Sequence, residues 1–426
     1  MGFRAIQPLA RPIDARLELP GSKSYSNRAL VCAALAGHPV SITNISPSGD
    51  TALMLNVLAD LGWSITRPNP VSRDVRLAPP KTPRPSSLTT EIRTGDAGTA
   101  TRFACALLAA LPGRFKLDCS ERMRERPIRG LLDALRQLGA KIEGGGFPLT
   151  IEGATLRGGT CTLDASDSSQ FLSALLMVAP TRGQPTLINL SGPLTSVSYV
   201  DVTIEVMRAF GLPKGYARRD GDTFHAQPAQ YTGREYSCPP DATGAGYFWA
   251  AAAITGGKGI VGGLRAGSPQ GDVALVGMLE NMGCKRLDYP NGLGIDATTC
   301  DRLSPINADL SELPDSAPTL AVVCAFAEGT SVLTGLSTLR GKECDRLAAL
   351  ESELTRLGAT VTVNNDQIRI EGGLGRLKGA KIKTYDDHRI AMSFALAGLK
   401  VPGVEIESPG CVAKSFPGFW DLLGRL

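Results

Sequence analysis

The sequence predicts an α/β protein of two lobes, each built from three repeats of one β/α unit. Three observations support this: the length of the chain, and two different helix signals that each recur six times. A chain of 426 residues, of which 43% are hydrophobic and 20% charged, is globular and long enough for two domains of ordinary size. Six units fit two lobes of three better than a single string of six.

The first recurring signal is an amphipathic helix that ends on an apolar residue followed by glycine. The six copies end at Gly62, Gly139, Gly211, Gly283, Gly358 and, in truncated form, Gly424. The intervals between these glycines are 77, 72, 72, 75 and 66 residues. We expect each glycine to end its helix in the left-handed conformation and a short strand to follow the first five helices. The clearest predicted strands are residues 64–66, 141–143 and 360–363.

The second signal is a helix of small apolar residues that also closes on glycine. Its copies end at Gly37, Gly113, Gly183, Gly256, Gly329 and Gly403, at intervals of 76, 70, 73, 73 and 74 residues. These helices lack a polar face, so we expect them at the centre of each lobe. The helices of the first set are charged on one side and are expected in the outer layer. The shared period predicts six copies of one unit.

Proline-containing segments indicate where the lobes join. The junctions are expected within residues 17–21 and 237–242. Residues 79–87 are also rich in proline and predict a loop inside the first lobe.

A polar cluster precedes each small-residue helix. The clusters are residues 22–28, 94–102, 166–170, 241–246, 314–318 and 385–389. Helix capping explains their Ser, Thr, Asp and Gly residues. It does not explain Lys23, Arg28, Arg102 and Arg389, because positive charge at a helix N-terminus opposes the helix dipole. If the six helix ends converge, they form a site for a ligand with several negative groups. Further basic clusters lie at 122–127, 340–346 and 409–417.

The composition argues against several other classes of protein. A net charge of +4 and a pI near 8.5 are mild for a nucleic-acid-binding domain, whose pI typically exceeds ~9. No apolar run approaches the ~20 residues that span a bilayer, so we expect a cytoplasmic protein without a membrane segment. The ten cysteines form no C-x-x-C pair and are expected to be reduced. The three histidines show no metal-binding pattern.

Eight motifs stand in one order along the chain. They are L-P-G-S-K-S-x-S-N-R-A-L, G-x-A-G-T-A-x-R, R-M-x-E-R-P-I, S-S-Q-F-L-S-A-L-L-M, L-P-D-x-A-x-T-L-A, K-E-x-D-R, D-D-H-R-x-A-M and P-G-C-x-x-K-x-F-P. In this order the chain resembles the 5-enolpyruvylshikimate-3-phosphate (EPSP) synthase family over essentially its full length. The resemblance implies an inside-out barrel fold, with buried helices inside each lobe, sheets outside and two crossing strands. It places the N-terminal lobe at 21–240 and assigns 1–20 and 241–426 to the C-terminal lobe.

The resemblance also implies a reaction. The enolpyruvyl group of phosphoenolpyruvate would pass to the 5-hydroxyl of shikimate 3-phosphate, with release of phosphate and without a cofactor or metal. By this resemblance the protein is a monomer whose partners are these two small molecules, with no nucleic acid and no membrane. Gly98 is the form of that residue associated with binding of the inhibitor glyphosate.

Site residues follow from the resemblance, motif by motif. The implied shikimate 3-phosphate ligands are Lys23, Ser24, Arg28, Ser168, Ser169, Gln170, Ser196, Asp315 and Lys342. The implied phosphoenolpyruvate ligands are Lys23, Gly98, Arg126, Gln170, Arg346, Arg389 and Lys414. The implied catalytic residues are Lys23, Asp315, Glu343 and His388. Asp315 would engage the 5-hydroxyl, Glu343 would serve the methylene proton, and Lys23 would bridge both substrates.

Departures from the family pattern leave alternatives open. Asp96, Phe103, Val197, Ser198 and Thr338 replace usual residues, so a paralogue with another acceptor is one alternative. A UDP-N-acetylglucosamine enolpyruvyl transferase is another, but its reactive Cys position corresponds to Glu121 here, and Cys119 is out of register. A non-catalytic anion-binding protein would be expected to lack Lys23, Asp315 or Glu343, and all three are present.

Overall fold

The chain folds into two compact units, each with its own hydrophobic core. The computed structural model describes residues 2–82 and 88–426, so the predicted loop at 79–87 lies partly outside the described residues. Unit 2 is Pro20–Pro239, and unit 1 combines Met1–Leu19 with Pro240–Leu426. The core of each unit is formed by its own helices and sheets.

Unit 2 contains two layers of helices. The inner helices are α1 (Lys23–Ala36), α3 (Gly98–Ala110) and α6 (Gln170–Val178). The outer helices are α2 (Gly49–Asp60), α5 (Arg129–Gln137) and α7 (Ser198–Ala209), with two short helices, α4 (Glu121–Arg124) and η1 (Ala179–Thr181). Most residues of the inner helices are buried, because these helices lack a polar face and pack on all sides.

Three four-stranded sheets surround these helices. In sheet order, they are β14 (Glu235–Ser237), β3 (Val40–Thr43), β5 (Val75–Ala78) and β4 (Ser64–Thr66); β6 (Thr89–Arg93), β7 (Arg114–Asp118), β9 (Leu149–Glu152) and β8 (Lys141–Glu143); and β10 (Gly159–Leu163), β11 (Thr186–Leu190), β13 (Thr223–Ala226) and β12 (Ala217–Asp220). In each sheet the first pair of strands is parallel and the other two pairs are antiparallel. Three sheets of one topology confirm the predicted repeat.

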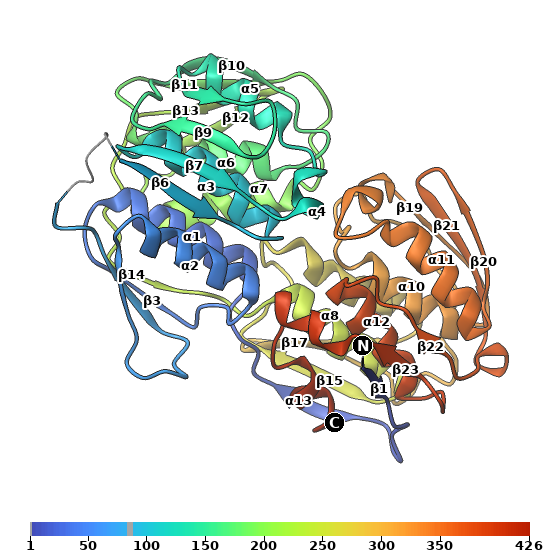
Figure 1. The fold of residues 1–426 in the computed structure, drawn as a ribbon. Helices are drawn as coiled ribbons and strands as arrows, with labels where there is room; N and C mark the ends of the chain where they lie inside the picture. Colours follow the sequence, from blue (N-terminus) through green and yellow to red (C-terminus); the bar gives the residue numbers. More distant parts are fainter. Residues whose placement is uncertain (1, 83–87) are drawn as a thin grey trace. The chain divides into compact units, whose positions relative to one another are not determined.

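Unit 1 repeats the same plan. Its inner helices are α8 (Ala242–Thr255), α10 (Ala317–Phe326) and α12 (His388–Gly398), and its outer helices are α9 (Leu275–Asn281), α11 (Arg346–Leu357) and α13 (Phe419–Leu423). Its 3₁₀ helices are η2 (Gly271–Ala274), η3 (Ser337–Gly341), η4 (Leu374–Arg376) and η5 (Pro409–Lys414). Every residue of α10 and α12 is buried. The three inner helices lie together inside the sheets of this unit (Figure 1).

The sheets of unit 1 include strands from both ends of the chain. In sheet order, they are β16 (Lys285–Tyr289), β17 (Gly292–Asp296), β15 (Lys258–Gly262) and β2 (Asp14–Leu17); β18 (Asn307–Asp309), β19 (Gly329–Thr334), β21 (Gln367–Gly372) and β20 (Thr360–Asn364); and a three-stranded sheet of β1 (Phe3–Ala5), β23 (Glu405–Glu407) and β22 (Lys381–Ile382). β2 is parallel to β15, and β1 is antiparallel to β23.

The predicted strands agree with the structure, whereas four of the small-residue helices end earlier than predicted: α3 at Ala110, α6 at Val178, α10 at Phe326 and α12 at Gly398. The predicted strands 64–66 and 141–143 are β4 and β8, and the predicted strand 360–363 is β20 with one more residue. Five of the six helix-ending glycines have positive φ as expected. The prediction is wrong for Gly424, whose φ is −73°. Its N–H continues the helical pattern by donating to the Trp420 carbonyl at 3.0 Å, so the residue keeps a right-handed helical conformation.

A close contact between strands β17 and β15 predicts a large effect of one substitution. A Cβ added at Gly294 would lie 2.1 Å from the Gly259 carbonyl oxygen, which is backbone and cannot move aside easily. We expect Gly294→Ala to lower the free energy of unfolding by about 2 kcal/mol or more. Gly277→Ala in α9 is the control, because nothing lies within 4 Å of its added Cβ. Urea unfolding would measure both, and equal midpoints for the two variants would contradict the expectation.

Candidate active site

The Arg346 side chain is the centre of a buried ion-pair network in unit 1. It starts α11 and is 1% exposed. Its Nε lies 2.7 Å from Asp387 Oδ2, and Asp387 is completely buried. Its Nη2 lies 2.7 Å from Glu343 Oε2, and its Nη1 lies 3.2 Å from Asp315 Oδ1. Burial favours a lower pKa for Arg346, but the three carboxylates together raise the pKa above its usual range. The guanidinium therefore stays charged.

Asp315 precedes helix α10 and lies among three positive side chains. Its Oδ2 is 2.6 Å from Arg389 Nη2, and its Oδ1 is 3.2 Å from Arg346 Nη1 and 3.9 Å from Lys342 Nζ. The carboxylate keeps 19% of its side-chain surface exposed. The two candidate proton-transfer groups, Asp315 and Glu343, are thus bound to different nitrogens of one guanidinium.

The other predicted residues of unit 1 lie at helix ends. His388 begins α12 and is fully buried, with its Nδ1 3.7 Å from Asp387 Oδ1. Lys414 ends η5 and is half-buried. Because the imidazole of His388 is enclosed, we expect any effect of this residue on the chemistry to pass through its neighbours Asp387 and Arg389.

In unit 2, Lys23 is the first residue of α1. Its Nζ lies 3.1 Å from Oδ2 of Asp50, a buried carboxylate in the first turn of α2. Ser22 is the N-cap of α1, yet its side chain makes no capping hydrogen bond. The Asp50 carboxylate offsets the unfavourable interaction of Lys23 with the helix dipole.

Arg28 lies one turn further along α1 and is almost entirely enclosed. It is 1% exposed, and its guanidinium donates to the Thr203 and Ser173 hydroxyls and to the Ser24 and Tyr199 carbonyls. Burial lowers the pKa of Arg28 to about 10. Arg28 therefore ties α1 to α6 and α7, so its replacement would also affect packing.

Two more predicted residues lie at the starts of inner helices: Gln170 begins α6 and Gly98 begins α3. The Gln170 side chain accepts a hydrogen bond from Arg102 Nη1 at 2.8 Å and donates one to Thr99 Oγ1 at 3.1 Å. Gly98 begins α3 beside Arg126: a Cβ added at Gly98 would lie 2.9 Å from Arg126 Nη1. Any larger residue at position 98 would therefore force the Arg126 guanidinium to move.

Three predicted serines lie next to the starts of α6 and α7. Ser168 Oγ accepts from the Gln170 N–H at 3.3 Å, and Ser169 is the N-cap of α6. Ser196 precedes the N-cap of α7 with φ of 53°, a left-handed conformation that costs a non-glycine residue on the order of 1 kcal/mol. Ser168 and Ser169 belong to the polar cluster 166–170, whereas Ser196 lies outside the six clusters.

The predicted residues divide between the units. Unit 2 contains Lys23, Ser24, Arg28, Gly98, Arg126, Ser168, Ser169, Gln170 and Ser196. Unit 1 contains Asp315, Lys342, Glu343, Arg346, His388, Arg389 and Lys414. Among the described residues, no group of three or more His, Cys, Asp or Glu side chains is arranged to hold a metal ion. Over the same residues, no helix has both the length and the apolar character needed to cross a bilayer.

Sequence reasoning missed two carboxylates of these networks. Asp387 caps α12 by accepting the Arg389 N–H at 2.8 Å, and it also holds Arg346. Asp50 holds Lys23. Both lie at helix starts, where an aspartate is explained by capping alone. The sequence did contain one indication of the role of Asp387: two aspartates, Asp386 and Asp387, precede His388, and a helix cap needs only one of them.

The structure shows the surroundings of Asp96, a departure from the family pattern, and of Cys119, the cysteine nearest the reactive position of the alternative family. The Asp96 carboxylate accepts a hydrogen bond from the Ser120 hydroxyl, which also caps α4 by accepting the Met123 N–H. Burial, and next the Asp118 carboxylate, raise the pKa of Cys119 to about 12. At neutral pH such a thiol is a poor nucleophile, unlike the reactive Cys of the UDP-N-acetylglucosamine enzymes.

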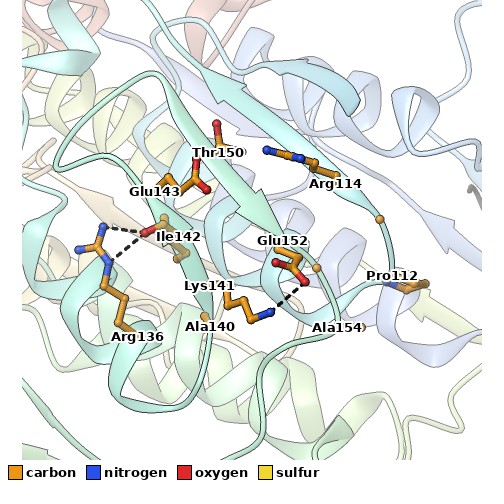
Figure 2. Close-up of a pocket in the computed structure, with 12 residues that line it drawn as sticks. Pro112, Arg114, Arg136, Ala140, Lys141, Ile142, Glu143, Thr150, Glu152 and Ala154 are labelled. Carbon is orange, nitrogen blue, oxygen red and sulfur yellow. Dashed lines mark hydrogen bonds and ion pairs between the residues drawn. The ribbon is translucent and has the colours of Figure 1, made fainter. Parts of the chain in front are cut away.

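The sheet of β7, β9 and β8 bears a separate hollow of about 810 Å³. Figure 2 shows Arg136 bonded to the Ile142 carbonyl and Lys141 paired with Glu152. None of the predicted site residues lines it. Its charged side chains are of both signs, and several are already paired with one another or with backbone carbonyls. The lining therefore indicates no particular ligand.

Comparison with known proteins decides the family. The sequence model of the family described as EPSP synthase (3-phosphoshikimate 1-carboxyvinyltransferase) matches residues 9–423. The chain belongs to the EPSP synthase family. It is 39% identical over 430 residues to the 3-phosphoshikimate 1-carboxyvinyltransferase of Syntrophobacter fumaroxidans, with 99% of each chain covered. It is 40% identical over 424 residues to the same enzyme of Trichormus variabilis, with 98% of this chain and 97% of the relative covered.

A solved structure of an EPSP synthase has the same fold as this chain. The EPSP synthase from Acinetobacter baumannii superimposes with a TM-score of 0.80 at 27% identity, covering 99% of this chain and 97% of that chain. These comparisons confirm the predicted family, the predicted class of transferase enzyme and the predicted α/β fold.

The Arg346 network predicts an effect of charge removal on stability. Asp387→Asn keeps a side chain that can cap α12 but removes one carboxylate from a buried guanidinium. We expect the free energy of unfolding to fall by about 3 kcal/mol. The control is Asp288→Asn, which removes an exposed ion pair with Arg286 and should cost less than about 1 kcal/mol. Urea unfolding at pH 7 measures both, and similar losses would contradict the buried-pair account.

Proposed function

We propose that this protein transfers the enolpyruvyl group of phosphoenolpyruvate to the 5-hydroxyl of shikimate 3-phosphate and releases phosphate. The observation that carries the proposal is the arrangement around Arg346, where Asp315 and Glu343 bind the two terminal nitrogens of one guanidinium. Addition and elimination at a vinyl carbon require one group that takes a proton and another that gives one. Family membership supports the same assignment.

The acceptor is proposed to bind mainly to residues of the N-terminal lobe. This lobe corresponds to 21–240, and its candidate ligands for shikimate 3-phosphate are Lys23, Ser24, Arg28, Ser168, Ser169, Gln170 and Ser196, with Asp315 and Lys342 from the other lobe. Backbone N–H groups and serine hydroxyls at helix starts suit a phosphate oxygen. Arg28 is the exception in this set, because its guanidinium already serves four protein acceptors.

Phosphoenolpyruvate is proposed to bind mainly through guanidinium and ammonium groups. The candidates are Arg346, Arg389 and Lys414 in the C-terminal lobe, which comprises 1–20 and 241–426, and Lys23, Gly98, Arg126 and Gln170 in the N-terminal lobe. Phosphate and carboxylate groups match the planar donor pattern of arginine. Phosphoenolpyruvate carries one of each.

The proposed chemistry has two steps. In the addition, Asp315 takes the proton of the 5-hydroxyl, the oxygen attacks C2 of phosphoenolpyruvate, and the methylene carbon gains a proton from Glu343. In the elimination, that carbon returns a proton to Glu343 as the C2–O bond to phosphate breaks, and the departing phosphate takes up the proton that Asp315 received from the hydroxyl. Lys23 offsets the charge of the departing phosphate. The reaction transfers an enolpyruvyl group and protons and releases phosphate, with no net change of oxidation state, so no redox cofactor is required.

The remaining aspects of the function are also proposals. We propose a cytoplasmic monomer that acts on small molecules and has no nucleic-acid or membrane partner. The mild net charge of +4 is consistent with this.

A coupled assay tests the proposal. Phosphate release from phosphoenolpyruvate should depend on shikimate 3-phosphate, and Asp315→Ala or Glu343→Ala should reduce turnover by about 100-fold or more. The loss should appear in kcat, because both groups act on protons that move in the reaction. Absence of acceptor-dependent release from the wild-type protein would refute the proposed function. Near-normal turnover of one variant would remove that residue from the chemistry.

Gly98 predicts a selective effect on one substrate. Gly98→Ala places a methyl group 2.9 Å from Arg126 Nη1, so the guanidinium must shift. We expect the KM for phosphoenolpyruvate to rise about tenfold, with a smaller change in the KM for shikimate 3-phosphate. Gly145→Ala in the same unit is the control, since nothing lies within 4 Å of its added Cβ. Equal changes in the two KM values for Gly98→Ala would argue against the assignment of Arg126 to phosphoenolpyruvate.

A further inference from the structure

Asp272 is a buried carboxylate that the proposed chemistry does not use. It lies in η2 and is 5% exposed. Its Oδ1 accepts the Ser316 hydroxyl at 2.5 Å, and its Oδ2 accepts the Thr243 hydroxyl at 2.9 Å. Ser316 precedes α10 and Thr243 lies in the first turn of α8, so one carboxylate connects the starts of two inner helices. A buried carboxylate is costly to retain, and hydrogen bonds to both oxygens reduce that cost.

Ser316 is positioned for Asp272 and does not act as an ordinary helix cap. It is the N-cap residue of α10, but its side chain makes no capping hydrogen bond. A serine cap typically contributes about 1 kcal/mol to helix stability. Here the hydroxyl bonds to Asp272 in place of an N–H of its own helix. This hydrogen bond also restrains the backbone of Asp315, because Asp315 shares a peptide unit with Ser316.

The segment that holds Asp272 is itself anchored. The adjacent Gln270 side chain accepts the Ala242 N–H at 2.9 Å and donates to the Pro240 carbonyl at 2.8 Å. Gln270 is also buried. The turn before η2 is therefore fixed against the start of α8, and Asp272 can transmit that rigidity to Ser316.

The ionisable groups that interact with Asp315 come from several elements. Lys342 follows η3, Arg346 begins α11, Arg389 lies in α12, Tyr247 lies in α8 and Asp272 lies in η2. Burial raises the pKa of Asp272, and the negative charge of Asp315 raises it further. The two hydroxyl donors and Arg389 oppose this shift and favour the carboxylate form. The two aspartates therefore interact electrostatically.

We infer that Asp272 is a positioning residue, which orients the Asp315 carboxylate for proton transfer through its hydrogen bond with Ser316. The inference rests on the proposed role of Asp315 as the group that takes the 5-hydroxyl proton. Lys342, Arg346 and Arg389 each lie within 4 Å of an Asp315 carboxylate oxygen and attract it toward different positions. The Ser316 contact anchors the backbone from which that side chain extends. The charge of Asp272 also makes ionisation of Asp315 less favourable, which strengthens it as a proton acceptor.

Three variants separate the hydrogen bond from the charge. Ser316→Ala removes the contact next to Asp315. Thr243→Val removes the other hydroxyl donor to Asp272, on the side of α8, and is the matched control. Asp272→Asn keeps an acceptor oxygen and a similar shape but removes the charge. Each is assayed by acceptor-dependent phosphate release, with kcat measured as a function of pH.

The expected results differ among the variants. Ser316→Ala should lower kcat about tenfold and change both KM values less than about threefold, because geometry at the proton acceptor is lost and binding is kept. Thr243→Val should stay within about threefold of wild type in kcat. Asp272→Asn should lower kcat and move the acidic limb of its pH profile to lower pH by about half a unit, because a negative neighbour of Asp315 is gone. Ser316→Ala should leave that limb in place.

Two results would overturn the inference. One is wild-type kcat for Ser316→Ala; the other is an equal loss for Ser316→Ala and Thr243→Val, which would indicate a general structural role. Thermal unfolding of each variant checks folding, and the serine and threonine variants decide the matter if Asp272→Asn does not fold. Asp315→Asn is assayed alongside: full activity would refute the proposed role of Asp315 itself. An inactive Asp315→Asn with a normal Ser316→Ala would refute only the inference about Asp272.

Discussion

The organisation of unit 1 depends on the burial of one positive charge. A guanidinium that is 1% exposed is stable only when carboxylates or other hydrogen-bond acceptors replace its water. Arg346 obtains them from Asp315 before α10, from Glu343 one turn away and from Asp387 before α12. The starts of two inner helices and one outer helix must therefore meet at a single point. Burial of this charge therefore brings the Asp315 and Glu343 carboxylates together at one guanidinium.

Unit 2 encloses an arginine in a different way. The guanidinium of Arg28 is surrounded by hydroxyl and carbonyl oxygens and stacks near aromatic rings, and among the described residues no carboxylate accepts a hydrogen bond from it. Neutral acceptors leave its positive charge uncompensated, and the lowered pKa reflects that state. Unit 1 thus balances its buried guanidinium with carboxylates, whereas unit 2 satisfies its buried guanidinium with neutral acceptors.

Regular features were predictable from the sequence, and most side-chain pairings were not. The 3.6-residue pattern and the helix-ending glycines predicted β4 and β8 to the residue, because a glycine with positive φ leaves few ways to continue the chain. Small residues predicted the buried helices. The pairs Lys23–Asp50 and Arg346–Asp387 join residues 27 and 41 positions apart. No local pattern encodes such partners, and each aspartate already had a sufficient local explanation as a helix cap.

The pairing of β2 with β15 has a consequence for how the protein is made. β2 ends at Leu17 and β15 begins at Lys258, while all of unit 2 lies between them in the chain. The two ends of unit 2 meet locally, since the Ser22 N–H donates to the Pro239 carbonyl. During synthesis, unit 2 can complete its core while β2 still lacks its partner. The edge of β2 then stays unpaired on the nascent chain, where other strands could pair with it, until β15 emerges from the ribosome.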